Sequence, residues 1–202
     1  MKTTILTAAI ALSAVLGISS SASAATGSKT EVSTVLTDVN NISAIEVHGN
    51  VQLYLTTGDE DKVKVYNNYY AESALVQEKN GTLRITSYNT EKLVVWVTVN
   101  SLSKLSAFDN AVVKSFGKFS AIDLAVTLHN HALAQLDMDA INASVTLTDR
   151  ARADLSGTAE NGKLQYPGSA FMNTSNFTAA RLTKNIIAKP MVCARPSELA
   201  SL

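Results

Sequence analysis

Two histidines and two aspartates lie close together in the segment LHNHALAQLDMD. His129 and His131 are two positions apart, so on a β-strand they lie on the same side and can present two imidazoles to one metal ion. Asp137 and Asp139 lie beyond that strand and reach the same ion only if the chain folds back. Arg150 is expected beside His131 in the next repeat, where its positive charge opposes a metal. The sequence leaves two interpretations, a metal site or a solvated outer face, and no cofactor is predicted.

Arg150 and Arg152 lie beside Asp149 and Asp154, a combination that suggests carbohydrate chemistry. Glycoside hydrolases need paired carboxylates on one surface, and polysaccharide lyases need a base close to an acid. The outward-facing acids do not accumulate in one column of the repeat described below. We therefore predict no catalytic residue, and keep both arginines as candidate ligand contacts. A lyase or hydrolase remains an alternative.

Tyrosines cluster beside asparagines in the segment YNNYY, which contains Tyr66, Tyr69 and Tyr70. A tyrosine ring offers an apolar face and the amides offer hydrogen bonds, so this segment is a candidate sugar-binding surface. The alternative is a loop whose amphipathic side chains lie on the core. Trp96 lies in the run KLVVWVTV, and we expect its side chain to be buried in the core.

A short alternating unit recurs around the histidine segment with a nearly constant period. The units are FDNAVVKSF (108–116), LHNHALAQL (128–136), LTDRARADL (147–155) and YPGSAFMNT (166–174). A fixed period near 20 is typical of solenoids, in which each unit stacks on its neighbours. The last three units are equally spaced, and the first lies one position further from the second.

Apolar residues alternate with polar ones along each unit, as in a β-strand with one buried side. The odd positions are predicted to point inward, which places Phe108, Ala132 and Ala151 in the core. The third position of each unit favours left-handed backbone geometry and is predicted to form a corner. That column contains Asn110, Asn130, Asp149 and Gly168.

These patterns predict an all-β fold, a single-stranded parallel β-helix with coils of about 19–20 residues. Its N-terminal part is more irregular, with a hairpin at Asn80-Gly81. A β-sandwich is the competing all-β fold, but it gives no reason for a regular period.

The N-terminus has the features of a signal peptide: Lys2, the apolar run ILTAAIALSAVLGI and the small residues Ala22-Ser23-Ala24. We divide the chain into a signal peptide (1–24), a linker (25–40), a β-helical domain (41–182) and an irregular tail (183–202). The expected location is the periplasm, the outer-membrane surface or the medium. The mature chain is expected to contain no transmembrane segment.

The charged residues balance, with 17 basic and 17 acidic side chains. The sequence therefore gives no electrostatic reason to expect nucleic acid as a partner. The single cysteine, Cys193, cannot form an internal disulfide. Burial and backbone pairing must therefore hold this fold together.

The segments NISAIEVHGNVQLYLTTGDEDKVKV, NGTLRITSYN and KLVVWVTVNSLSKLSAFDNAVVKS resemble the auto-transporter adhesin family with the head GIN domain, over residues 41–180. The resemblance implies an exported β-helical domain without an assigned reaction. We therefore predict a non-catalytic envelope module that presents its surface to a polysaccharide or an envelope protein. The alternatives are a carbohydrate-active enzyme and a metal-binding protein that uses His129 and His131. The oligomeric state is left open.

Overall fold

The computed structural model describes residues 33–36, 39–66 and 74–187, and within these ranges every regular element is a β-strand. The expected signal peptide, Tyr69, Tyr70 and Cys193 lie outside the described residues. The strands are β1 (Ser33–Leu36), β2 (Ala44–Gly49), β3 (Val51–Thr57), β4 (Lys62–Tyr66), β5 (Ala74–Lys79), β6 (Thr82–Ser87), β7 (Leu93–Val99), β8 (Lys104–Ala107), β9 (Val112–Ser115), β10 (Phe119–Leu128), β11 (Leu133–Leu147), β12 (Arg152–Pro167) and β13 (Phe171–Ile187).

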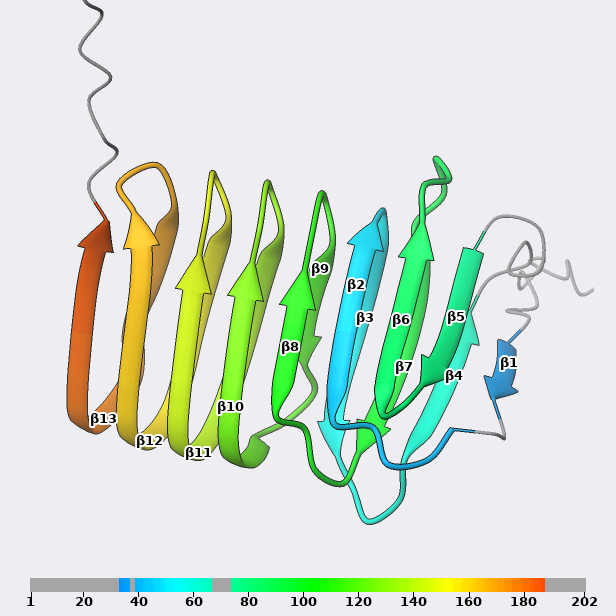
Figure 1. Cartoon of the computed structure of the whole chain (residues 1–202), viewed down its shortest axis with the longest axis horizontal. Coiled ribbons are helices and arrows are strands. Elements are labelled where there is room, and N and C mark those ends of the chain that lie inside the picture. The colour runs from blue at the N-terminus through cyan, green and yellow to red at the C-terminus, as the bar shows by residue number, and fades with distance from the viewer. Residues whose placement is uncertain (1–32, 37–38, 67–73, 188–202) are drawn as a thin grey trace, which may run out of the picture. The chain divides into compact units, whose positions relative to one another are not determined.

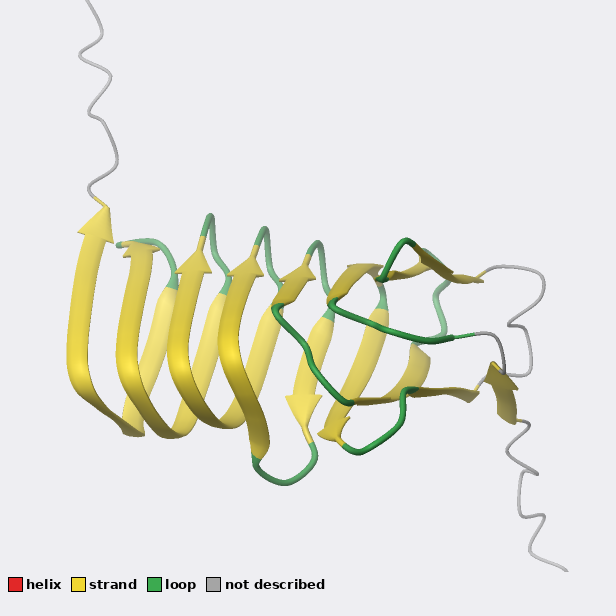
Figure 2. Cartoon of the chain, turned by 60° about the horizontal axis from the view of Figure 1, so that its bottom comes forward, coloured by secondary structure: helices red, strands yellow, loops and turns green. Residues whose placement is uncertain are grey.

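The strands form one hydrogen-bonded sheet that curls into two rows (Figure 1). The first row contains β6, β2, β8, β10 and the second halves of β11, β12 and β13. The second row contains β7, β3, β9 and the first halves of the same three long strands. The long strands bend between the rows, as Figure 2 shows. We call one passage through both rows a coil.

The C-terminal coils have the register that the repeat predicts up to a β-bulge after Asp154, beyond which the step from β12 to β13 is one position longer. Leu133 pairs with Arg152, and Arg152 pairs with Phe171, so both steps equal the spacing of the last three units of the repeat. The preceding step, from Val112 to Leu133, is one residue longer than the repeat predicts. The predicted alignment of the first unit is therefore wrong by one position.

The coils of the N-terminal half do not follow one another in space. The pair β2–β3 lies between β6–β7 and β8–β9, because β2 pairs with both β6 and β8, and β3 pairs with both β7 and β9. At the far edge, β1, β4 and β5 pair antiparallel with their neighbours. The all-β class is confirmed. A continuous β-helical winding of the whole domain is not, since the first coils are out of sequence order.

The hairpin between β5 and β6 forms where the sequence predicts it. Asn80 and Gly81 both have positive φ, 54° and 74°, as a two-residue hairpin turn requires. The backbone N–H of Gly81 also donates to the Glu78 carboxylate over 2.7 Å. This antiparallel pair forms one edge of the first row.

The core consists of apolar side chains stacked from coil to coil. Ala132 and Ala151 are fully buried, and Ala170 is partly buried against the same cluster. The N–H of Arg152 donates to the Ala132 carbonyl over 2.9 Å, and that of Phe171 donates to the Ala151 carbonyl over 3.1 Å. The three alanines are thus neighbours in space, which confirms the layered stacking of these coils.

A column of left-handed residues turns the chain between the rows. It contains Gly49 (φ 84°), Asp109 (φ 60°), Asn130 (φ 59°) and Asp149 (φ 57°). The prediction is correct for Asn130 and Asp149. Asn110 and Gly168 also lie in turns between strands, but without left-handed backbone: the longer coil puts Asp109 in that conformation, and Gly168 has no positive φ.

The same error of one position places Phe108 on the wrong side. A shift of one position in a strand moves every side chain to the opposite face. The inward residues of this coil are Ala107, Ala111 and Val113, and the half-buried Phe108 packs on the outside.

Trp96 is not in the core, in contrast to the expectation. The inward residues of β7 are Leu93, Val95, Val97 and Val99, so Trp96 points outward and is half-buried. Its ring stacks on Tyr54 with centroids 4.6 Å apart and contacts Phe116 at 5.2 Å. Neighbouring aromatic rings, rather than the core, cover its faces.

Candidate functional site

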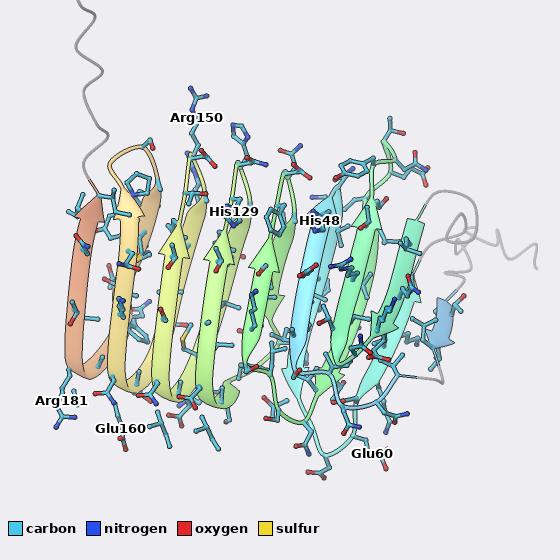
Figure 3. All side chains as sticks on the ribbon, viewed as in Figure 1. His48, Glu60, His129, Arg150, Glu160 and Arg181 are labelled. Atoms are coloured by element: carbon cyan, nitrogen blue, oxygen red, sulfur yellow. The ribbon has the colours of Figure 1, made fainter. Side chains whose placement is uncertain are left out.

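His129 is held by its neighbours in a stack of three rings. Its ring lies 4.6 Å from that of Phe108, which in turn lies 4.3 Å from that of His48, and all three rings are nearly parallel. Its Nδ1 is 2.9 Å from the Thr148 hydroxyl. His48 and His129 both lie near the edge where the rows meet at the corners (Figure 3). These contacts give His129 a packing role.

His131 does not share a strand with His129. β10 ends at Leu128 and β11 begins at Leu133, so the two histidines flank the corner residue Asn130. The assumption that they lie on one strand face is therefore wrong. His131 is exposed at this corner, and Arg150 follows one coil later.

The two aspartates of the same segment lie further along β11. The Asp137 N–H donates to the Ser115 hydroxyl, and the Asp139 carboxylate accepts from Thr158 over 2.8 Å. In the part of the chain that the structure describes, no three His, Cys, Asp or Glu residues gather in an arrangement that could hold a metal ion.

The corner residues bond to one another along the stack. The Asn130 amide donates to the Asp109 carboxylate over 3.0 Å, and its backbone N–H donates to the Asp149 carboxylate over 3.1 Å. This backbone hydrogen bond is the main reason why the pKa of Asp149 is lowered, followed by the bond from Thr148. Tyr88 lies next to Asp109 in the same stack. Its pKa is raised, mainly by slight desolvation and secondly by the Asp109 carboxylate. The polar corner groups thus stabilise the turns.

Arg150 and Arg152 point in different directions. Arg150 projects from the corner edge (Figure 3), and Arg152 is exposed on the outer side of β12. The ion pairs among the described residues are Lys62–Glu60 and Arg84–Glu46, so neither arginine is paired with an acid. The nearby Asp149 is occupied by the corner bonds. The structure does not assemble these residues into one site.

Tyr66 is half-buried at the end of β4, where Lys64 lies over its ring with Nζ 4.7 Å from the centroid. It is therefore available only in part to a sugar. Tyr69 and Tyr70, which completed the candidate surface, lie outside the described residues.

A row of polar side chains that sequence reasoning missed lies at the bend of the long strands. The Asn142 amide donates to the Asp123 carboxylate over 2.6 Å, and the Asn161 amide donates to the Asn142 oxygen over 2.8 Å. Arg181 then donates to the Asn161 oxygen over 3.3 Å. Arg181 projects at the edge opposite to Arg150 (Figure 3). The equal sequence spacing of the first three members, which matches the period of the repeat, could have revealed this row.

These side chains line an open groove of about 600 Å³, which we call the amide groove. A second column lies beside the first and continues the same register: Ala125, Ser144, Lys163 and Thr183. A separate groove of about 630 Å³ is lined by Ile122 and Ile141, together with Asp139 and Thr158. At the bend, polar side chains and a concave surface therefore coincide.

Several solved structures share the fold. A structure from Parabacteroides distasonis described as a "Putative lipid binding protein" has a TM-score of 0.60 at 13% identity, and the match covers 79% of this chain and 80% of that one. A "putative adhesin" from the same species has a TM-score of 0.56 at 14% identity, covering 80% of each chain. A "putative adhesin" from Parabacteroides merdae has a TM-score of 0.55 at 13% identity, covering 81% of this chain and 80% of that one. At these identities the likeness concerns the fold alone.

No curated protein matches the chain. Among the residues that the structure describes, there is no helix with the length and hydrophobicity needed to cross a bilayer. A family model described as "Putative auto-transporter adhesin, head GIN domain" matches residues 41–199. This match confirms the family resemblance and extends beyond the domain end expected at 182, as does β13, which ends at Ile187. The chain belongs to the auto-transporter adhesin, head GIN domain family.

Proposed function

We propose that this protein is an exported, non-catalytic binding module of the cell envelope, which presents the outer surface of a short parallel β-helix to a polysaccharide or a protein. Residues 1–24 would serve as the signal peptide, 25–40 as a linker and 183–202 as the tail. The family name and the names of the matched structures, which are those of adhesins and a lipid-binding protein, support a binding role.

The observation that carries this proposal is the alignment of outward side chains from coil to coil. Direct pairing at equal steps along the sequence superimposes Asp123, Asn142 and Asn161. Adjacent strands lie about 4.8 Å apart, so such columns repeat polar groups at a constant interval. A ligand with its own short repeat can contact several coils at once, and many weak contacts then add up.

The alternatives predict different measurements. A lyase or hydrolase would need paired carboxylates, and the described acids near Arg150 and Arg152 are engaged in corner bonds or separated in different columns. Turnover of an envelope polysaccharide by the purified protein would favour the enzyme. Zinc titration of the wild type and of His129→Ala tests the metal-binding alternative, which requires tighter binding by the wild type.

The proposal is tested by locating the protein and capturing its ligand. Cell fractionation should find the full chain outside the cytoplasm, and deletion of residues 2–24 should retain it inside. A glycan array together with a pull-down from the envelope fraction should identify a saccharide or an envelope protein. A cytoplasmic location of the full chain, or the absence of any captured ligand, would contradict the proposal.

A further inference from the structure

The amide groove has side chains that are already fixed in position. In each step along the row, the side chain of one coil donates to an oxygen of the coil before it: Arg181 to Asn161, Asn161 to Asn142, and Asn142 to Asp123. All hydrogen bonds therefore run in the same direction. Because the neighbours already order each side chain, a ligand would not have to immobilise them, and this lowers the entropic cost of binding.

The row still has hydrogen-bonding capacity toward solvent. An asparagine amide carries two N–H donors. Asn142 and Asn161 each use one of them in the hydrogen bonds along the row. The Asp123 carboxylate has a second oxygen, and Ser144 adds a hydroxyl beside the row. Donors and acceptors thus alternate along the groove floor, which suits sugar hydroxyls because each hydroxyl both donates and accepts.

Positive charge collects at one end of the groove. The charged residues of its lining are Asp123, Lys163 and Arg181. Asp123 lies at the β10 end and is bonded to Asn142, whereas Lys163 and Arg181 lie on the last two coils. Arg181 donates one of its five N–H groups to Asn161, and Lys163 is exposed. The positive charge at the β12–β13 end favours an anionic group there.

The shape of the groove favours a linear chain over other anions. It crosses four coils, which at strand spacing is roughly 14 Å, so it has room for several linked sugars. A peptide strand would need an unpaired sheet edge to add to, and the groove floor consists of strands that are paired on both sides over β10, β11 and β12. Nucleic acid is disfavoured because the chain has no net positive charge.

We propose that the amide groove binds a carboxylate-bearing polysaccharide, with the sugar hydroxyls on Asn142 and Asn161 and a carboxylate on Lys163 and Arg181. This inference rests on the proposed binding function and names its ligand class. A carboxylate bonded to a guanidinium gains a charge-assisted bond that a neutral sugar cannot form.

The test is calorimetric titration of the protein with an oligogalacturonate, and with maltohexaose as the neutral probe. The wild type should bind the acidic probe and not the neutral one. Lys163→Ala and Arg181→Ala should each weaken binding about tenfold, since one charge-assisted hydrogen bond is worth about that much. Arg152→Ala is the matched control, because it removes an exposed arginine of β12 outside the groove, and it should leave the affinity unchanged. Circular dichroism verifies that each variant is folded.

The proposal is overturned if Arg152→Ala weakens binding as much as Arg181→Ala, because the attraction would then be general. It is also overturned if the double variant Lys163→Ala/Arg181→Ala keeps the wild-type affinity, or if the wild type binds neither probe. In that last case the broader binding function survives if the envelope pull-down captures a protein or a different glycan. The two failures are thereby distinguishable.

Discussion

Lys184 follows a column of inward residues that is apolar from β6 to β12. In the first row, strand pairing places one inward residue of each coil over that of the next coil. The inward residues of the coils before β13 are almost completely buried. From β6 to β13, the column contains Leu83, Ile45, Leu105, Val126, Val145, Leu164 and Lys184. The Lys184 ammonium donates to the Thr174 hydroxyl over 2.9 Å, across the open end of the last coil. A charge therefore lies where the next apolar layer would begin.

This charge matters because β13 is an edge strand. Within the described residues it pairs with β12 alone, and it exposes Phe171, Leu182 and Ile186. Exposed sheet edges with apolar side chains tend to pair with another chain, and an inward-pointing lysine is one way to prevent this. We expect Lys184 to keep two copies of the protein from stacking end to end.

The perturbation is Lys184→Leu in the full chain. Burial of one leucine side chain stabilises an interface by about 1.5–3 kcal/mol, so two copies related by symmetry gain about 3–6 kcal/mol. That gain corresponds to an increase of roughly two to four orders of magnitude in the association constant. In the wild type the same contact would desolvate two ammonium groups, at a cost of several kcal/mol for each.

Sedimentation velocity over a concentration series measures the effect. The wild type should stay monomeric where Lys184→Leu forms dimers or larger assemblies. Lys163→Leu is the matched control, since it replaces an exposed outward lysine of the neighbouring strand with the same residue, and it should behave as the wild type. The reasoning is refuted if Lys184→Leu is folded and remains monomeric, or if Lys163→Leu associates equally well.

Three further predictions test the fold. Gly157→Ala should destabilise the protein by about 3 kcal/mol or more in urea unfolding, because φ is +98° and a β-carbon would overlap a backbone carbonyl oxygen. Gly117→Ala is the control: φ is +78° but the space around it is open, so it should cost only about 1–2 kcal/mol. Equal losses would contradict the steric argument. Ala132→Leu should cost about 1–3 kcal/mol through overpacking, whereas Ala125→Leu, on an exposed site, should change the free energy of unfolding little. The lowered pKa of Asp149 means that its carboxylate stabilises the fold above the unfolded pKa, and that this contribution is lost as pH falls below about 4. Asp149→Asn should therefore be less stable than the wild type at pH 7, and the difference should shrink at pH 3; a constant difference would contradict this assignment.

The regular coils could be predicted from the sequence because three signals agree there. Alternation identifies Leu128, Ala134 and Leu136 as inward residues, the corner needs a left-handed residue at Asn130, and the constant period fixes the register. The order of the N-terminal coils could not be predicted in this way. β2, β6 and β8 all present the same alternating pattern to the core, so side-chain alternation does not determine which strand lies between the other two.

The amide groove was missed for a different reason. The inward residues are hydrophobic in every coil, so the sequence shows them as a pattern. The groove residues share only their position within the repeat. Asp123, Asn142 and Asn161 are each ordinary polar residues in the sequence, and only their register brings them into contact. Conversely, His129 and His131 attracted attention because of their residue type, although the corner between them sends their side chains to different surroundings.

This separation of inward and outward columns explains how chains of low sequence identity can share the fold. The fold requires apolar residues at alternate positions and a left-handed residue at each corner, and it sets no such requirement for the outward positions of the strands. Chains with 13–14% identity can therefore keep the fold. The outward columns, such as the one from Asp123 to Arg181, are then free to change without loss of the fold. Differences in binding between family members are consequently expected in the residues that line the bend, while the alanines and leucines of the core stay apolar.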